Sequence, residues 1–238
     1  AILSVTSGTA TQSGDILEDM PSSLEKTGAG TLVLGGSNNY SGATIVSGGT
    51  LQISTSDAIP YNSDVQVASG ATLAVDGGLG SYGVEFGSLG DHAGAGGTVT
   101  VGSGTDLYVG GGGANGNSTT FSGVLTADSL TYNGSGTLTL TGSGNTVDQI
   151  NICACVVAGG ITVSGNMMTT TAVTVEAGTF TVADGATFNT FAIDDQSAVV
   201  IKGASTVTMA AGGGAVAIVT GTATDAAALT VREASTLT

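Results

Sequence analysis

The stretch from Thr27 to Ile53 constrains the fold of this chain more than any other. It holds two segments of alternating apolar residues, Thr31–Leu34 and Thr50–Ile53, each preceded by glycines. A turn cluster, Asn38–Gly42, and a third short segment, Thr44–Val46, lie between them. Short strands joined by tight Gly, Asn and Ser corners are typical of a solenoid, in which each turn stacks on the one before it. The stretch therefore predicts about one turn of a β-solenoid and the start of the next.

Similar strand starts recur along the chain. From Thr31 to Thr50 the step is 19 residues, Thr72 follows after 22, and Thr98 after 26. Steps of this size suit one turn of a solenoid, with the extra residues placed in corner loops. We therefore expect a single all-β solenoid domain over residues 1–238 with roughly ten turns. Its best repeat is 27–53, and a degenerate second copy covers 134–163.

The composition supports this fold and excludes several functions. The chain has 41 glycines, 41% hydrophobic residues and only 9% charged residues, against about 25% charged in a typical domain. Alternating apolar residues exclude a disordered chain, and irregular glycine spacing excludes collagen. The net charge of −15 argues against nucleic-acid binding and against docking on anionic membranes. The longest nearly apolar run, Ile150–Ile161, is too short to cross a bilayer, so we expect no membrane insertion by this segment.

Three runs in and beside the opening stretch identify a family resemblance. Lys26–Leu34, Asn38–Val46 and Gly49–Ile53 resemble, in order and spacing, the passenger-associated transport repeat of autotransporter passenger domains from Gram-negative bacteria. The resemblance implies a right-handed parallel β-helix exposed on the outer cell surface. It also implies a non-enzymatic, adhesive or structural rod. The expected partners are glycans or proteins of host or neighbouring cells, or copies of the chain itself, and we expect the chain to be a segment of a longer protein.

Two alternatives without catalysis remain open. The sequence stops within a strand-like segment, Ser235–Thr238, and an uncapped solenoid end is a template for pairing. A homo-oligomer built through such ends would be a subunit of an extracellular filament or sheath. Thr-x-Thr pairs such as Thr98-x-Thr100 raise ice binding, although the uneven steps between turns are expected to break a regular threonine array.

The sequence offers little for catalysis. The single histidine, His92, follows Ser88 in a glycine-rich insertion without a nucleophile motif. A polysaccharide-active enzyme would need paired carboxylates with a basic partner, and Asp194–Asp195 with Lys202 is the nearest grouping. With three basic residues in the whole chain, we expect no enzyme and no catalytic residue.

Two further local patterns bear on binding and redox state. Gly102–Tyr108 and Gly111–Asn117 resemble a calcium-binding nonapeptide turn, although Asn replaces Asp in the second copy. We expect no cofactor, with calcium as the alternative. Cys153 and Cys155 point to the same face if their segment is a strand, so they form either a small disulfide or a pair of buried thiols.

The repeat itself contains no reactive group, so it predicts scaffold. We expect binding specificity where the repeat pattern breaks, at Asp76–Gly97, Tyr108–Thr120 and Asp148–Ala158.

Overall fold

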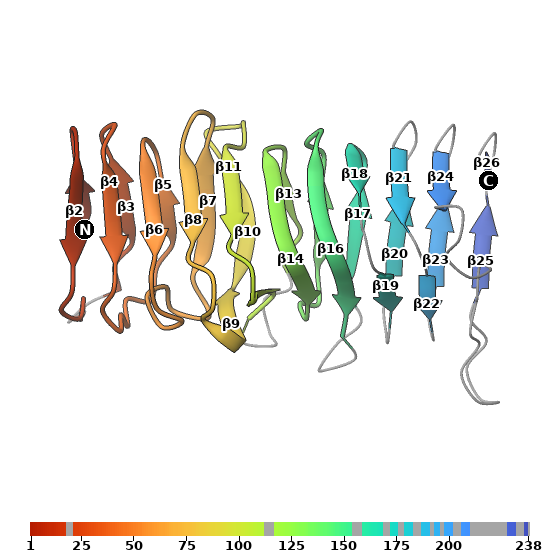
Figure 1. Ribbon diagram of the computed structural model, residues 1–238, viewed down its shortest axis with the longest axis horizontal. Coiled ribbons are helices and arrows are strands. Elements are labelled where there is room, and N and C mark those ends of the chain that lie inside the picture. The colour runs from red at the N-terminus through yellow and green to blue at the C-terminus, as the bar shows by residue number, and fades with distance from the viewer. Residues whose placement is uncertain are drawn as a thin grey trace.

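The computed structural model is an elongated stack of parallel β-strands (Figure 1). It describes residues 1–17, 21–111, 117–153, 159–168, 172–175, 179–182, 187–190, 193–195, 198–201, 206–209, 228–231 and 236–237. Every strand pairing within its three sheets is parallel. No helix occurs in the part of the chain that the structure describes. The expected all-β parallel solenoid is therefore confirmed.

The second sheet is the longest and runs along the whole stack. Its main path passes through eleven strands, which differs slightly from the roughly ten turns expected. In order they are β2 (Thr9–Gln12), β4 (Thr31–Leu34), β6 (Thr50–Ile53), β8 (Thr72–Val75), β11 (Thr98–Val101), β14 (Val124–Tyr132), β16 (Asn145–Ile152), β18 (Asn166–Met168), β21 (Thr187–Thr190), β24 (Thr206–Met209) and β26 (Thr236–Leu237).

The first and third sheets form another side of the solenoid. The first holds β1 (Ile2–Ser4), β3 (Leu24–Thr27), β5 (Thr44–Val46), β7 (Asp64–Ala68) and β10 (Ser88–His92). The third holds β13 (Thr119–Phe121), β15 (Thr137–Leu140), β17 (Gly160–Val163), β20 (Thr179–Val182), β23 (Ala198–Ile201) and β25 (Ala228–Val231). Because β13 lies against β10, the third sheet continues the row begun by the first.

A side row of strands joins the second sheet from Gly80 onward. It consists of β9 (Gly80–Phe86), β12 (Thr105–Val109), the second halves of β14 and β16, β19 (Ala172–Val175) and β22 (Ile193–Asp195). The long strand β14 pairs first with β11 and then with β12, so it belongs to both rows. Before Gly80, loops occupy the corresponding side of each turn.

Two places where the repeat pattern breaks form strands. The insertion Asp76–Gly97, expected to place its extra residues in corner loops, forms β9 and β10. The break at Asp148–Ala158 begins within β16, which continues as far as Ile152. In both places the alternation of apolar residues is short, but each strand pairs with a parallel neighbour that supplies hydrogen bonds to its backbone.

The core is a stack of aliphatic side chains in register. Leu32, Leu51, Leu73, Val99 and Leu125 are buried and occupy one register position in successive strands of the second sheet. Alternate residues of a strand point to opposite faces, so the threonines that start β4, β6, β8 and β11 point outward. Each inward residue therefore packs against its equivalents in the turns before and after it. At about 25 cal/mol per Å² of buried apolar surface, this repeated burial is the main favourable contribution to folding.

The outward threonines form a ladder despite the uneven steps. Thr9, Thr31, Thr50, Thr72 and Thr98 are direct register partners in successive strands of the second sheet. The uneven steps do not interrupt this row, because the loops absorb the extra residues. The next outward row, however, contains Thr11, Val33, Gln52, Ala74 and Thr100, so a two-dimensional threonine array does not form.

Candidate functional site

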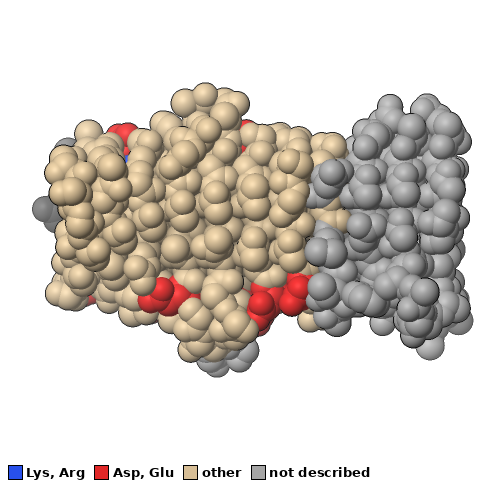
Figure 2. Space-filling model, turned by 45° about the horizontal axis from the view of Figure 1, so that its top comes forward, with Lys and Arg blue, Asp and Glu red and all other residues tan. Residues whose placement is uncertain are grey.

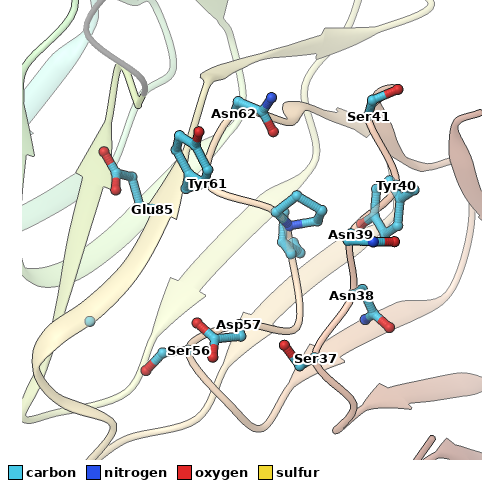
Figure 3. A pocket seen from close by; sticks show the side chains of 13 residues that line it. Ser37, Asn38, Asn39, Tyr40, Ser41, Ser56, Asp57, Tyr61, Asn62 and Glu85 are labelled. Atoms are coloured by element: carbon cyan, nitrogen blue, oxygen red, sulfur yellow. The ribbon is translucent and has the colours of Figure 1, made fainter. Parts of the chain in front are cut away.

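A hollow in the described residues lies where three successive turns meet. It is a pocket of about 510 Å³. One corner, Ser37–Ser41, one loop, Ser56–Asn62, and two residues of β9, Gly83 and Glu85, line it (Figure 3). Its size falls in the range of about 300–1,000 Å³ that is common for small-molecule sites.

Asn38 holds the first two segments together. Its side chain is almost fully buried, and its Nδ2 donates to the Ala58 carbonyl at 2.7 Å. Its Oδ1 accepts from the Ile16 amide at 2.7 Å and from Gln12 Nε2 at 3.2 Å. The Asn38 amide donates to the Asp57 carbonyl at 3.1 Å. One asparagine thus fixes the corner against the turn on either side of it.

A chain of buried hydroxyls lies behind the pocket. The Tyr40 hydroxyl and Thr44 Oγ1 are 2.6 Å apart, and Thr44 Oγ1 and Ser63 Oγ are 2.8 Å apart. Ser63 Oγ donates to the Gly42 carbonyl at 2.9 Å, which sets the direction of donation at that end. Tyr40 is 1% exposed, and burial raises its pKa to about 12, although its hydrogen bond to Thr44 acts in the opposite direction. The hydroxyl is therefore neutral at physiological pH and ties the corner to the next turn.

The rim of the pocket carries exposed polar and aromatic groups. Tyr61 is 59% exposed, and Asn39, Asp57 and Asn62 are also exposed. Glu85 is half-buried, and its Oε1 accepts from Asn133 Nδ2 at 3.2 Å. The charged side chains among the lining residues are Asp57 and Glu85, both acidic.

Gly111 supports both Tyr61 and Glu85 from a neighbouring turn. A Cβ at this position would lie 2.0 Å from the Tyr61 carbonyl oxygen and 3.0 Å from Glu85 Cγ. The close approach of backbone therefore requires glycine here. The rim is set by packing across turns as well as by the loop that contains Tyr61.

The wider surface is polar but sparsely charged. The face in Figure 2 has a broad field without charged side chains, and acidic side chains gather near its lower border. Two smaller hollows lie elsewhere. One, of about 290 Å³, is lined by residues of β7, β10 and β13. The other, of about 380 Å³, is lined by Ser, Thr and Gly of the third sheet and its loops.

Ser88 and His92, which the structure describes, do not form a catalytic pair. Ser88 and His92 lie at opposite ends of β10, about 13 Å apart along a strand. Ser88 Oγ donates to Asp64 Oδ1 at 2.8 Å, and His92 Nδ1 is 3.3 Å from Gln66 Oε1. Asp194 and Asp195 are in β22, while Lys202 lies outside the described residues.

The calcium and cysteine predictions fall partly outside the described chain. Asp106 of the first nonapeptide is in strand β12, and residues 112–116 of the second are outside the described ranges. No group of three His, Cys, Asp or Glu side chains that could hold a metal occurs among the residues that the structure describes. Cys153 follows β16, and its amide donates to the Tyr132 carbonyl at 2.9 Å. Cys155 lies outside the described residues, so the disulfide with Cys153 stays a prediction.

Sequence reasoning found only part of the pocket. Gly83 and Glu85 belong to the insertion Asp76–Gly97, where specificity was expected. The corner Ser37–Ser41 belongs to the repeat, which predicts scaffold, and the repeat pattern makes no prediction for the loop Ser56–Asn62. The sequence does contain one indication of this loop. Pro60, Tyr61 and Asn62 lie between two strand-like segments, and Pro and Asn are typical turn residues, so Tyr61 is expected in an exposed turn.

Among the described residues, no helix is long and apolar enough to span a membrane.

Two stretches of the chain match a known family model, and a longer stretch is similar to a known protein. The family model of the passenger-associated-transport-repeat matches residues 24–53 and 130–165, close to the two copies expected from the sequence. The chain is 35% identical over 147 residues to the adhesin BmaC autotransporter of Brucella suis biovar 1 (strain 1330). The match covers 61% of this chain and 4% of that protein. No solved structure matches.

Proposed function

We propose that this chain, which carries the transport repeat of autotransporter passenger domains, is part of a non-enzymatic adhesive rod on the outer surface of a bacterial cell. The observation that carries this proposal is the set of polar groups on the surface. Hydroxyl, amide and carboxylate groups are displayed on a rigid stack, with a pocket that contains no nucleophile paired with a histidine base. A passenger domain is surface-exposed, and the relative is named an adhesin, which also supports the proposal.

The structure suits adhesion by many weak contacts. The row Thr9, Thr31, Thr50, Thr72 and Thr98 repeats one hydroxyl in successive turns, so a ligand with repeated units can contact several turns at once. Linked weak contacts raise the overall affinity far above that of one contact. Cell-surface glycans and surface proteins both offer such repeated contacts.

Attachment of coated beads tests the proposal. Beads coated with this chain should adhere to animal or bacterial cells more than beads coated with albumin. Treating the cells with glycosidases or with protease then separates glycan from protein partners. Adhesion no greater than that of albumin beads would contradict the proposal. An enzymatic activity would also contradict it. Such an activity would be seen if the parental chain released reducing sugar from a polysaccharide and the double variant Asp194→Asn, Asp195→Asn did not.

Self-association into a filament is a separate outcome, and electron microscopy of the purified chain distinguishes it. Short monodisperse rods would contradict a filament subunit.

A further inference from the structure

We propose that the pocket formed by Ser37–Ser41, Ser56–Asn62 and β9 is a binding subsite for an uncharged pyranose sugar of a surface glycan. This inference rests on the proposed adhesive function and names the ligand class of one site on the rod. Its argument uses the lining chemistry, the charge and the rigidity of the pocket.

The exposed ring of Tyr61 provides the apolar surface that a sugar needs. One face of a pyranose ring is made of C–H groups. Stacking this face on a flat aromatic ring removes it from water, which is favourable. Tyr61 is 59% exposed at the rim, so its ring is accessible to a ligand. A large aromatic side chain left in solvent beside polar groups is typical of binding surfaces.

The other lining groups match the hydroxyls of a sugar. Carboxylate oxygens accept hydrogen bonds, and asparagine side chains both accept and donate them. Glu85 and Asn62 lie on either side of Tyr61 in the pocket lining, and Asp57 lies farther along it, near Ser37 and Ser56 (Figure 3). Bonds from sugar hydroxyls to carboxylates are charge-assisted and therefore stronger than those between neutral groups.

The charge of the pocket selects against acidic sugars. Asp57 and Glu85 line it, and its lining includes neither lysine nor arginine. The chain as a whole has a net charge of −15. A sialic or uronic acid would therefore meet like charges at the site and an unfavourable field on approach. An uncharged hexose or N-acetylhexosamine meets neither.

The pocket is built before a ligand arrives. Asn38 fixes the corner, the Tyr40–Thr44–Ser63 hydroxyls fix its connection to the next turn, and Asn133 bonds to Glu85. Groups that are already ordered lose little entropy on binding. This rigidity compensates for the small contact area of a single sugar.

Glycan conjugates and four variants test the subsite. The probes are multivalent polymer conjugates of mannose, galactose, N-acetylglucosamine, lactose and sialyllactose, measured by biolayer interferometry on the immobilised chain. At least one neutral conjugate should bind, and sialyllactose should bind more weakly than lactose. Tyr61→Ala should weaken neutral binding about tenfold or more, whereas Tyr61→Phe, which keeps the ring, should stay within about threefold.

A matched pair of charge variants separates the pocket from net charge. Asp57→Asn should weaken neutral binding, because a carboxylate acceptor is lost. Asp128→Asn removes the same charge outside the pocket and should leave neutral binding unchanged. Circular dichroism melting checks that each variant is folded, and Tyr61 is a suitable position because its side chain is exposed.

The outcomes distinguish the subsite from the adhesive function. If coated beads adhere to cells but no neutral conjugate binds, or if folded Tyr61→Ala binds as the parental chain does, the subsite is wrong and the adhesive function stands. If neutral conjugates bind through Tyr61 but beads do not adhere, the subsite stands and the adhesive function is wrong. Stronger binding of sialyllactose than of lactose also overturns the subsite. Two further measurements identify the source of the sugar. Binding to purified neutral bacterial polysaccharide indicates a bacterial source, and loss of bead adhesion to animal cells after glycosidase treatment indicates an animal source.

Discussion

Tyr40 combines a polar group with almost complete burial. Its hydroxyl contacts Thr44 Oγ1, and burial raises its pKa to about 12. In the unfolded chain the pKa returns to its ordinary value of 10.0. The folded state therefore binds more protons than the unfolded state between these two values, and stability falls as pH rises through that window.

This predicts an alkaline loss of stability that Tyr40→Phe reduces. Between about pH 8 and about pH 11, the contribution of Tyr40 should fall by about 1.4 kcal/mol. Tyr40→Phe should cost about 1 kcal/mol near neutral pH through the lost hydrogen bond, but its free energy of unfolding should fall less steeply with pH. Urea unfolding at both pH values measures this.

Thr31→Ser, which changes no ionisable group, is the control and should keep the parental dependence on pH. Equal slopes for the parental chain and Tyr40→Phe would contradict the assignment. Burial also raises the pKa of Tyr132, and burial together with Asp106 and Glu85 raises that of Tyr108. Both act in the same direction as Tyr40, so the variant should reduce the alkaline loss without abolishing it.

Lys26 is a second buried polar residue, and it stabilises a corner. Its side chain is fully buried, and Nζ donates to the carbonyls of Thr27, Gly28 and Gly48 at 2.9 Å each. Burial lowers its pKa, but the three carbonyls satisfy all three donors of the ammonium. The bond to Gly48 connects adjacent turns.

Replacing Lys26 should therefore destabilise the fold. Lys26→Met keeps much of the side-chain volume but removes a charged donor from three carbonyls, which should cost about 2–4 kcal/mol. Denaturant unfolding measures the loss. Thr31→Ser on the outer surface is a control that should change stability by less than about 0.5 kcal/mol. An unchanged midpoint in Lys26→Met would show that water replaces the ammonium.

At the scale of elements, short strands with regular alternation were predictable from the sequence. Thr31–Leu34, Thr44–Val46 and Thr50–Ile53 are strands as expected, because alternation and glycine corners are local signals. The side row was missed because β9 contains Gly80 and Gly83 and has little alternation of its own. It is stabilised by β12, which lies a turn away, so its signal is not local.

The pocket was missed for a related reason. Asn38 and Tyr40 look like turn residues in the sequence, and as such they were assigned to scaffold. Their contacts to Ala58 and, through Thr44, to Ser63 come from the next turn. Which loops meet across turns depends on the stacking register, and a pattern within one repeat does not contain that information.

Gly83 shows how one turn shapes the next, and it provides a matched pair of variants. Its φ is +50°, and a Cβ would lie 1.9 Å from the Asp106 carbonyl oxygen. Gly78 has φ of +75° but nothing within 4 Å of a Cβ. Both positions are strained for alanine, but only Gly83 adds a steric conflict with β12.

Gly83→Ala should therefore cost more than Gly78→Ala. The strain alone costs about 1–2 kcal/mol per residue, and the conflict at Gly83 should raise the loss to about 3 kcal/mol. Because Gly83 lies two residues from Glu85, its variant should also weaken neutral-glycan binding, while Gly78→Ala should not. Thermal melting and interferometry measure both effects. Equal losses of stability would contradict the close contact with β12.

At the scale of the whole molecule, the chain carries many negative charges and few positive ones to offset them. The chain has 18 acidic and three basic residues, and one of the basic residues, Lys26, is buried. Like charges repel more strongly in the folded rod than in the expanded unfolded chain, so they lower stability. Dissolved salt screens this repulsion, with a Debye length of about 30 Å at 0.01 M and about 10 Å at 0.1 M.

Raising sodium chloride from about 10 mM to about 150 mM, across the range in which the Debye length shortens most, should therefore raise the melting temperature by a few degrees. Calcium chloride at matched ionic strength should give a similar rise if screening is the only effect, because the described residues hold no group of three metal-ligating side chains. A specific site at the nonapeptide-like segment Gly102–Asn117 would instead produce a larger rise that saturates with calcium and disappears on adding a chelator. Asp106→Asn distinguishes screening from a specific calcium site. If only screening acts, the variant removes one charge and responds to calcium as the parental chain does. If Asp106 is a calcium ligand, the variant loses the calcium-specific part of the rise.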